Sequence, residues 1–218
     1  MKKTSIFVVA GLVMALSTVN PTTAKAQKAK GEVVVTGGAG YSIVGLLLNV
    51  INKGLNTTGT VSSSKTPVIL GAVDYGITDR FSVGACYTYQ GITAKYNSFT
   101  MTDTAGNNVT VNGDFKDRIT RQSIGIRPLF HFGENEDLDL YVGARFSYVF
   151  WNITSSRADV STADVFKGFG SPIKPQFLFG MRYFFVPAVG FNAEFAIGPT
   201  YFMQVGISAR FGGTGAAK

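Results

Sequence analysis

Six charged side chains stand out because each falls on the polar face of a strand-like segment whose other face is apolar. Two are acids and four are arginines, and all lie within a few residues of a short predicted turn: Asp74, Arg127, Arg145, Arg182, Glu194 and Arg210. A charge that leaves water needs a partner, because an unpaired buried charge is costly. Arg182 and Glu194 fall on adjacent segments across one turn, which predicts that they lie close together.

Two interpretations of these six charges remain open. They could form a salt-bridge plug that fills the interior of a closed sheet, since an eight-stranded barrel is only just wide enough for side chains. They could instead form a gate or selectivity ring, which with four arginines and two acids would favour anions. Replacing Glu194 by Ala would destabilise a plug, whereas it would change the conductance of a pore.

Nucleophilic catalysis would need a histidine close to a serine or cysteine and to an acid. His131 is the only histidine, and Ser123 on the same segment is eight residues away, which corresponds to more than about 20 Å along a strand. Cys86 is the only cysteine and falls among small residues. No Ser-His-acid set can be assembled near the long predicted loops, so the sequence predicts an interior histidine and a packing cysteine rather than an enzyme.

Metal and cofactor sites find no support in the residue pattern. One histidine and one cysteine cannot supply a typical ligand set. The acidic cluster of Glu134, Glu136, Asp137 and Asp139 lacks the EF-hand pattern and predicts a solvated turn. The glycine-rich residues 37–40 lack the Lys-Ser/Thr of a phosphate loop. We therefore expect no catalytic residues, no metal and no cofactor.

The elements that must hold the six charges are strands, because apolar and polar residues alternate through most of the chain. Residues 177–185 show the pattern, with Phe177, Phe179 and Met181 on one face and Leu178 and Arg182 on the other. Eight segments are predicted, at residues 33–46, 66–77, 81–95, 118–132, 138–152, 174–186, 190–197 and 200–211. Long loops at 47–65, 96–117 and 153–173 alternate with short turns, as in up-and-down transmembrane barrels.

The composition favours a membrane barrel over a soluble one. Charged residues make up 15% of the chain, where about 25% is usual. A soluble calyx of the lipocalin type would carry charges on its outer face, and here that face is apolar with aromatic residues near both ends. One predicted girdle comprises Tyr75, Phe81, Phe132, Phe185, Phe191 and Phe211, and the other comprises Tyr87, Tyr89, Tyr148, Phe150 and Tyr201.

The first 26 residues predict a secretory signal peptide. Lys2 and Lys3 precede an apolar run at residues 5–16, and residues 24–26 (AKA) match the small-residue rule for cleavage before Gln27. Removal of this segment also removes three lysines from a net charge of +7. The remaining excess is too small and too scattered for nucleic-acid binding. The predicted domains are a signal peptide at 1–26, a barrel at 27–211 and a short periplasmic tail at 212–218.

Four segments resemble the small eight-stranded outer-membrane β-barrel proteins of Gram-negative bacteria, in the form found in the Bacteroidota. They lie at residues 75–85 (YGITDRFSVGA), 139–148 (DLYVGARFSY), 182–198 and 205–211 (VGISARF). The last segment also resembles the assembly signal read by the barrel-insertion machinery, with its positions at Gln204, Gly206, Ala209 and Phe211. The resemblance does not decide the function, because such families include adhesins, structural proteins, small channels and lipid-modifying enzymes.

The sequence thus predicts an all-β protein: an eight-stranded antiparallel up-and-down transmembrane β-barrel. It predicts a monomer in the bacterial outer membrane, with extracellular long loops and both termini in the periplasm. The expected partners are outer-membrane lipid, lipopolysaccharide and, during biogenesis, the barrel-assembly machinery. The predicted role is structural or surface-interacting with a plugged polar lumen, and the alternative is a narrow anion-preferring pore.

Overall fold

The computed structural model describes residues 30–42, 61–102, 105–132, 137–156 and 172–212. The predicted signal peptide, parts of the three predicted long loops and residues 213–218 lie outside these ranges. In the described residues no helix is long and apolar enough to span a membrane.

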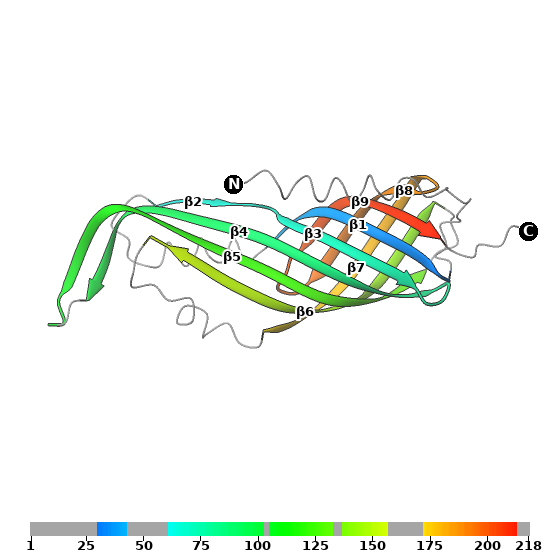
Figure 1. The fold of residues 1–218 in the computed structure, drawn as a ribbon, viewed down its shortest axis with the longest axis horizontal. Helices are drawn as coiled ribbons and strands as arrows, with labels where there is room; N and C mark the ends of the chain where they lie inside the picture. The colour runs from blue at the N-terminus through cyan, green and yellow to red at the C-terminus, as the bar shows by residue number, and fades with distance from the viewer. Residues whose placement is uncertain (1–29, 43–60, 103–104, 133–136, 157–171, 213–218) are drawn as a thin grey trace, which may run out of the picture.

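The described residues form a closed antiparallel barrel (Figure 1). Its strands are β1 (Glu32–Tyr41), β2 (Val61–Lys65), β3 (Val68–Gly76), β4 (Phe81–Thr102), β5 (Asn108–Phe132), β6 (Leu138–Ser155), β7 (Ile173–Val186), β8 (Val189–Ile197) and β9 (Met203–Gly212). β2 and β3 pair with successive parts of β4 and therefore occupy one strand position in the barrel wall. We call each such position a stave, so the barrel has eight staves. β1 pairs with β3 on one side and β9 on the other, which closes the barrel. The predicted fold is confirmed.

Strand alternation separates a polar interior from an apolar outer surface. On β7, Phe177 exposes 71% of its surface while Arg182, five residues on, exposes none. The same alternation of exposed and buried positions runs along β3, β6 and β8. Large apolar side chains therefore cover the outside of the barrel, and most of the buried polar side chains point into the lumen.

The predicted long loop at 96–117 is wrong, because β4 and β5 continue through most of it. Their pairing extends from Phe81 and Phe130 to Thr102 and Asn108, with one register shift between Tyr96 and Ser98. The segment is rich in Thr and Asn, which suggested a loop. It also carries β-branched and aromatic residues that favour strands when they pair across a hairpin.

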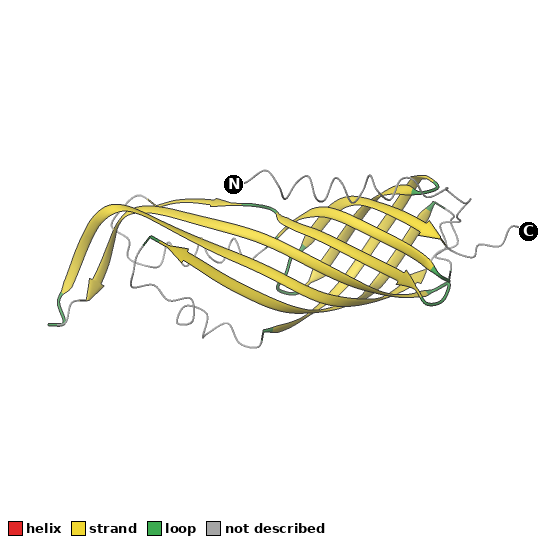
Figure 2. Ribbon diagram, viewed as in Figure 1, coloured by secondary structure: helices red, strands yellow, loops and turns green. Residues whose placement is uncertain are grey.

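The two ends of the barrel differ in shape, as Figure 2 shows. At the end called here the turn end, β3–β4, β5–β6 and β7–β8 are joined by short connections. At the opposite hairpin end, β4 and β5 run past the other staves. We call their residues beyond Gly91 and Thr120 the hairpin arm. β2 pairs with the base of the arm along β4, and the end of β6 pairs with it along β5.

One residue of the predicted outer girdle lies inside the barrel. Tyr201 exposes only 1% of its surface, whereas the neighbouring Phe202 and Met203 are both exposed. The predicted strand at 200–211 begins only at Met203. Residues 198–202 connect β8 to β9, so the alternation of β9 does not extend back to Tyr201 and its ring can turn into the lumen.

Candidate functional site

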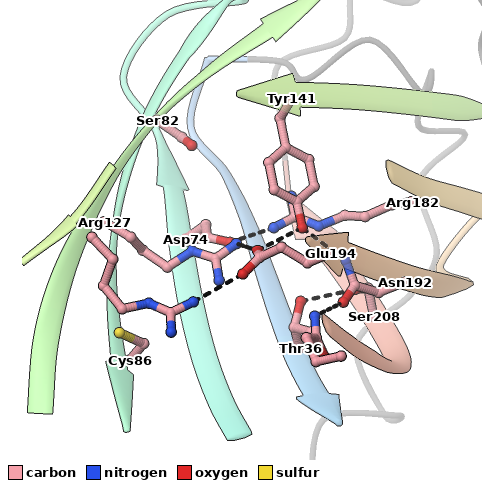
Figure 3. A network of polar contacts seen from close by, with 12 residues as sticks. Thr36, Asp74, Ser82, Cys86, Arg127, Tyr141, Arg182, Asn192, Glu194 and Ser208 are labelled. Carbon is pink, nitrogen blue, oxygen red and sulfur yellow. Dashed lines mark hydrogen bonds and ion pairs between the residues drawn. The ribbon is translucent and has the colours of Figure 1, made fainter. Parts of the chain in front are cut away.

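The lumen near the turn end holds a network of buried ionised side chains from five staves. The strand alternation points Asp74 (β3), Arg127 (β5), Arg145 (β6), Arg182 (β7) and Glu194 (β8) inward, and all five are fully buried. Figure 3 shows Asp74, Arg127, Arg182 and Glu194 converging on one another across the lumen. The short turns explain this gathering, since they hold neighbouring strands in fixed register at this end.

Glu194 is the centre of one half of the network. Its Oε2 lies 3.1 Å from Arg127 Nη2, and its Oε1 lies 2.9 Å from Arg145 Nη2. The hydroxyl of Tyr141 donates to Oε2 at 2.8 Å, and the hydroxyl of Tyr201 donates to Oε1. Two guanidiniums and two hydroxyls therefore compensate the loss of water around one carboxylate.

Asp74 is the centre of the other half. Its Oδ1 lies 3.0 Å from Arg127 Nε, and its Oδ2 lies 2.5 Å from Arg182 Nη2. Arg127 therefore bridges the two carboxylates Asp74 and Glu194. The Tyr141 ring lies 4.7 Å from the Arg182 guanidinium and 5.7 Å from that of Arg127, within the range of a cation–π contact.

Asp139 is part of this network, although its acidic neighbours suggested a solvated turn. Its Oδ2 lies 3.2 Å from Arg182 Nη1, and its side chain is almost fully buried. The alternation of β6 explains this, because Asp139 is two residues before the inward-facing Tyr141. With Asp139 included, three carboxylates accompany the four predicted arginines, all of them buried, which lowers from two to one the excess of positive charge on which an anion-selective ring was predicted.

A row of Ser82, His131 and Asp139 lies beside the network. His131 Nε2 is 2.8 Å from Ser82 Oγ, and His131 Nδ1 is 2.6 Å from Asp139 Oδ1. Sequence reasoning missed Ser82 because it lies on β4, whose register against β5 at the turn end cannot be read from a nearby turn. Asp139 could have been found, since it follows His131 across the short β5–β6 connection.

This row has the order of a nucleophile, base and acid, yet its surroundings differ from those of a reactive serine. Ser82 has no exposed surface, so its hydroxyl is closed to a substrate. Asp139 divides its two oxygens between His131 and Arg182. In this geometry the row links β4, β5, β6 and β7 by polar contacts at the turn end.

The other predicted lumen residues lie around these groups. Arg210 donates from Nε to the Pro187 carbonyl, and its guanidinium lies 4.0 Å from the Phe184 ring centroid. Cys86 is buried with its Sγ 3.5 Å from the Gly125 carbonyl oxygen, in the position of a small packing residue. Among the described residues, no cluster of His, Cys, Asp and Glu could hold a metal ion.

The four residues of the predicted assembly signal lie on β9, the strand that closes the barrel against β1. Gln204 and Gly206 face the lumen side, whereas Ala209 and Phe211 have the opposite strand parity. Gly206 pairs with Gly38. A Cβ at Gly206 would lie 2.2 Å from the Gly37 carbonyl oxygen, so this position admits only glycine at the observed spacing. Recognition of these residues by the insertion machinery stays a prediction.

The comparisons with known proteins show the fold. No protein-family model matches the chain, and no curated protein sequence matches it. The structure is similar to outer membrane protein OprG from Pseudomonas aeruginosa, with a TM-score of 0.50, 10% identity and coverage of 86% of this chain and 99% of that chain. This likeness identifies the fold as that of a small outer-membrane β-barrel.

Two further barrels match less closely. The N-terminal β-barrel domain of Pseudomonas aeruginosa OprF has a TM-score of 0.41 and 12% identity, and the match covers 84% of this chain and 100% of that chain. The attachment invasion locus protein Ail of Yersinia pestis, solved with a heparin analogue, has a TM-score of 0.39 and 11% identity, covering 84% of this chain and 99% of that chain.

Proposed function

We propose that this protein is a non-enzymatic, monomeric barrel of the outer membrane of a Gram-negative bacterium, related to the Bacteroidota barrels that its sequence resembles. Its lumen is closed by the buried ion network, and its hairpin end faces the outside. There the hairpin arm and the neighbouring segments contact lipopolysaccharide or an external partner.

The observation that carries this proposal is the filled lumen at the turn end. Arg127, Arg145 and Glu194 are fully buried inside the barrel. An eight-stranded barrel leaves room for side chains and little else. Solutes could pass only if Glu194 and Asp74 separated from their guanidiniums, and each separation would leave charges without partners.

The hairpin arm supports a role in surface contact. From Gln90 to Thr102, β4 extends about 40 Å at the usual rise of a strand. Tyr96, Phe99 and Phe115 form an aromatic cluster on it, with ring centroids 5.5 Å apart for Tyr96–Phe115 and 4.9 Å for Phe99–Phe115. Paired strands and a packed aromatic cluster therefore extend well beyond the barrel, which a role confined to the membrane does not require.

The orientation follows from the general plan of outer-membrane barrels, in which short turns face the periplasm and long connections face outward. The turn end is then periplasmic, as are both termini. On this basis Phe211, near the end of β9, lies on the periplasmic side, where the barrel-assembly machinery would read it during insertion.

The test is the conductance of the refolded full chain in a planar lipid bilayer, with folding checked by heat-modifiable migration. We expect a silent bilayer for the wild type and for Glu194→Gln, which keeps the side-chain volume. Glu194→Ala is measured beside them, because it removes the centre of the network. Discrete anion-selective conductance steps in the wild type, altered by either substitution, would contradict the proposal of a closed lumen and favour the narrow anion-preferring pore.

A further inference from the structure

A cavity of about 120 Å³ lies at the hairpin end of the lumen. Residues of β5, β6, β7 and the β8–β9 connection line it: Arg121, Ser123, Val149, Trp151, Lys174, Pro199 and Thr200. Pro199 is exposed, and Trp151 and Lys174 are partly exposed, so the cavity borders the surface. Thr200 precedes Tyr201, whose hydroxyl donates to Glu194, so the plug begins directly beneath the cavity.

Arg121 is a buried guanidinium held by neutral oxygens. It exposes 3% of its surface and donates to the carbonyls of Pro199, at 2.8 Å, and Thr200, and to the hydroxyl of Ser42, at 3.2 Å. Among the described residues, no carboxylate forms an ion pair with it. These three bonds use Nη1 once and Nη2 twice, which leaves one N–H on Nε and one on Nη1 of the five that arginine carries.

A second polar group at the cavity, the Thr200 hydroxyl, has unused hydrogen-bonding capacity. Thr200 is 2% exposed, and its Oγ1 makes no hydrogen bond within the described part of the chain. A buried hydroxyl without a partner is uncommon because its desolvation is uncompensated. The apolar part of the lining includes Val149 and the indole of Trp151, whose ring centroid lies 5.7 Å from the Arg121 guanidinium.

We propose that this cavity binds a small carboxylate anion with an apolar body. The free N–H groups of Arg121 and the Thr200 hydroxyl would hold the carboxylate, and Val149 and Trp151 would contact the apolar part. A closed cavity of about 150 Å³ with apolar walls takes up benzene. This cavity is smaller, at about 120 Å³, but it borders the surface, so the apolar body can be no larger than one ring with the rest of the ligand toward the opening.

The site goes beyond the proposed function, because it needs neither a pore nor a macromolecular partner. The ligand enters from the hairpin end and stops at the plug, so it is bound and not carried through the barrel. The lumen then has two parts. The sealed half, at the turn end, is filled by the ion network, and the other half, at the hairpin end, holds the binding cavity.

The experiment uses the refolded full chain in detergent micelles, with benzoate as the probe and benzamide as its neutral counterpart of the same shape. Trp151 is the only tryptophan of the chain and lies in the cavity wall, so its fluorescence reports occupancy directly. We expect a saturable change with benzoate, and none with benzamide over the same concentrations. Arg121→Gln should weaken benzoate binding by roughly tenfold or more, as loss of a charged hydrogen-bond donor predicts.

The matched control is Arg118→Gln, on the same strand, because Arg118 donates to the Tyr89 hydroxyl at 3.0 Å and does not line the cavity. It should bind benzoate as the wild type does. Thr200→Val keeps the shape and the guanidinium, and it should still weaken binding if Arg121→Gln does not fold. The absence of a saturable change, equal responses to benzoate and benzamide, or unaltered binding in the folded cavity variants would each overturn the proposal.

Discussion

Buried arginines have different partners at the two ends of the lumen. At the turn end, Arg127, Arg145 and Arg182 each lie against a carboxylate. At the hairpin end, Arg121 is equally buried but is held by two carbonyls and a hydroxyl. Charge pairing at one end locks the staves together, whereas neutral acceptors at the other leave part of the guanidinium's bonding capacity unused.

The different lengths of the staves account for this contrast. At the turn end, short connections bring all the staves to a common rim, so side chains from every side meet and fill the interior. At the hairpin end β1 stops at Tyr41 and β8 at Ile197, whereas β4 and β5 continue to Thr102 and from Asn108. Among the described residues fewer strands surround the lumen there, and a cavity lies between them.

The largest expected effect comes from Glu194→Ala in the sealed half. The substitution leaves Arg127 and Arg145 buried without one of their carboxylates and removes the acceptor of two tyrosine hydroxyls. We expect a loss of about 3–5 kcal/mol in the free energy of unfolding, measured by urea titration of the protein in lipid vesicles.

The comparison variant for that measurement is Arg118→Gln, which lies on β5 outside the network. It should unfold within about 1 kcal/mol of the wild type, because Arg118 is only partly buried and its replacement removes a single hydrogen bond to the Tyr89 hydroxyl. A loss for Glu194→Ala no greater than that of Arg118→Gln would mean that the network does not hold the sealed half together.

A smaller effect is expected from His131→Ala at the edge of the same half. Ser82 then loses its hydrogen-bond partner and Asp139 loses the contact with His131, so the unfolding free energy should fall by about 1–3 kcal/mol. The urea titration used for Glu194→Ala measures it.

A fluorophosphonate probe applied to the folded wild type should leave Ser82 unlabelled, because its hydroxyl is fully buried. Labelling that disappears in Ser82→Ala would instead make the row a serine nucleophile site.

The smallest effect on the barrel is expected from Phe115→Ala in the hairpin arm. Its ring packs on Tyr96 and Phe99 far from the lumen, so the unfolding transition of the barrel should shift by less than about 0.5 kcal/mol. Limited proteolysis should cut the arm faster than in the wild type, since the aromatic cluster is broken. Unchanged proteolysis would show that backbone pairing alone orders the arm.

The errors of sequence reasoning fall where local pattern and chain geometry disagree. In the sequence, Tyr201 continues the alternation of β9 and is predicted to face outward. In the structure it belongs to the β8–β9 connection, and its hydroxyl contacts Glu194 in the lumen. Asp139 lies in an acidic run that looks solvated, yet strand parity carries it to Arg182. The hairpin arm has the composition of a loop, and only its pairing across β4 and β5 makes it a strand.

The sequence by itself determined the barrel, because alternation with a period of two assigns each side chain to one face and the small share of charge excludes a solvated exterior. It also indicated that Asp74, Glu194 and the four predicted arginines point inward, although it missed Asp139. Only the tertiary structure decided which of them meet, since partners such as Arg127 and Glu194 come from staves that are not joined by a turn. Their distances depend on the register and closure of the whole barrel, and no local stretch of sequence encodes either of these.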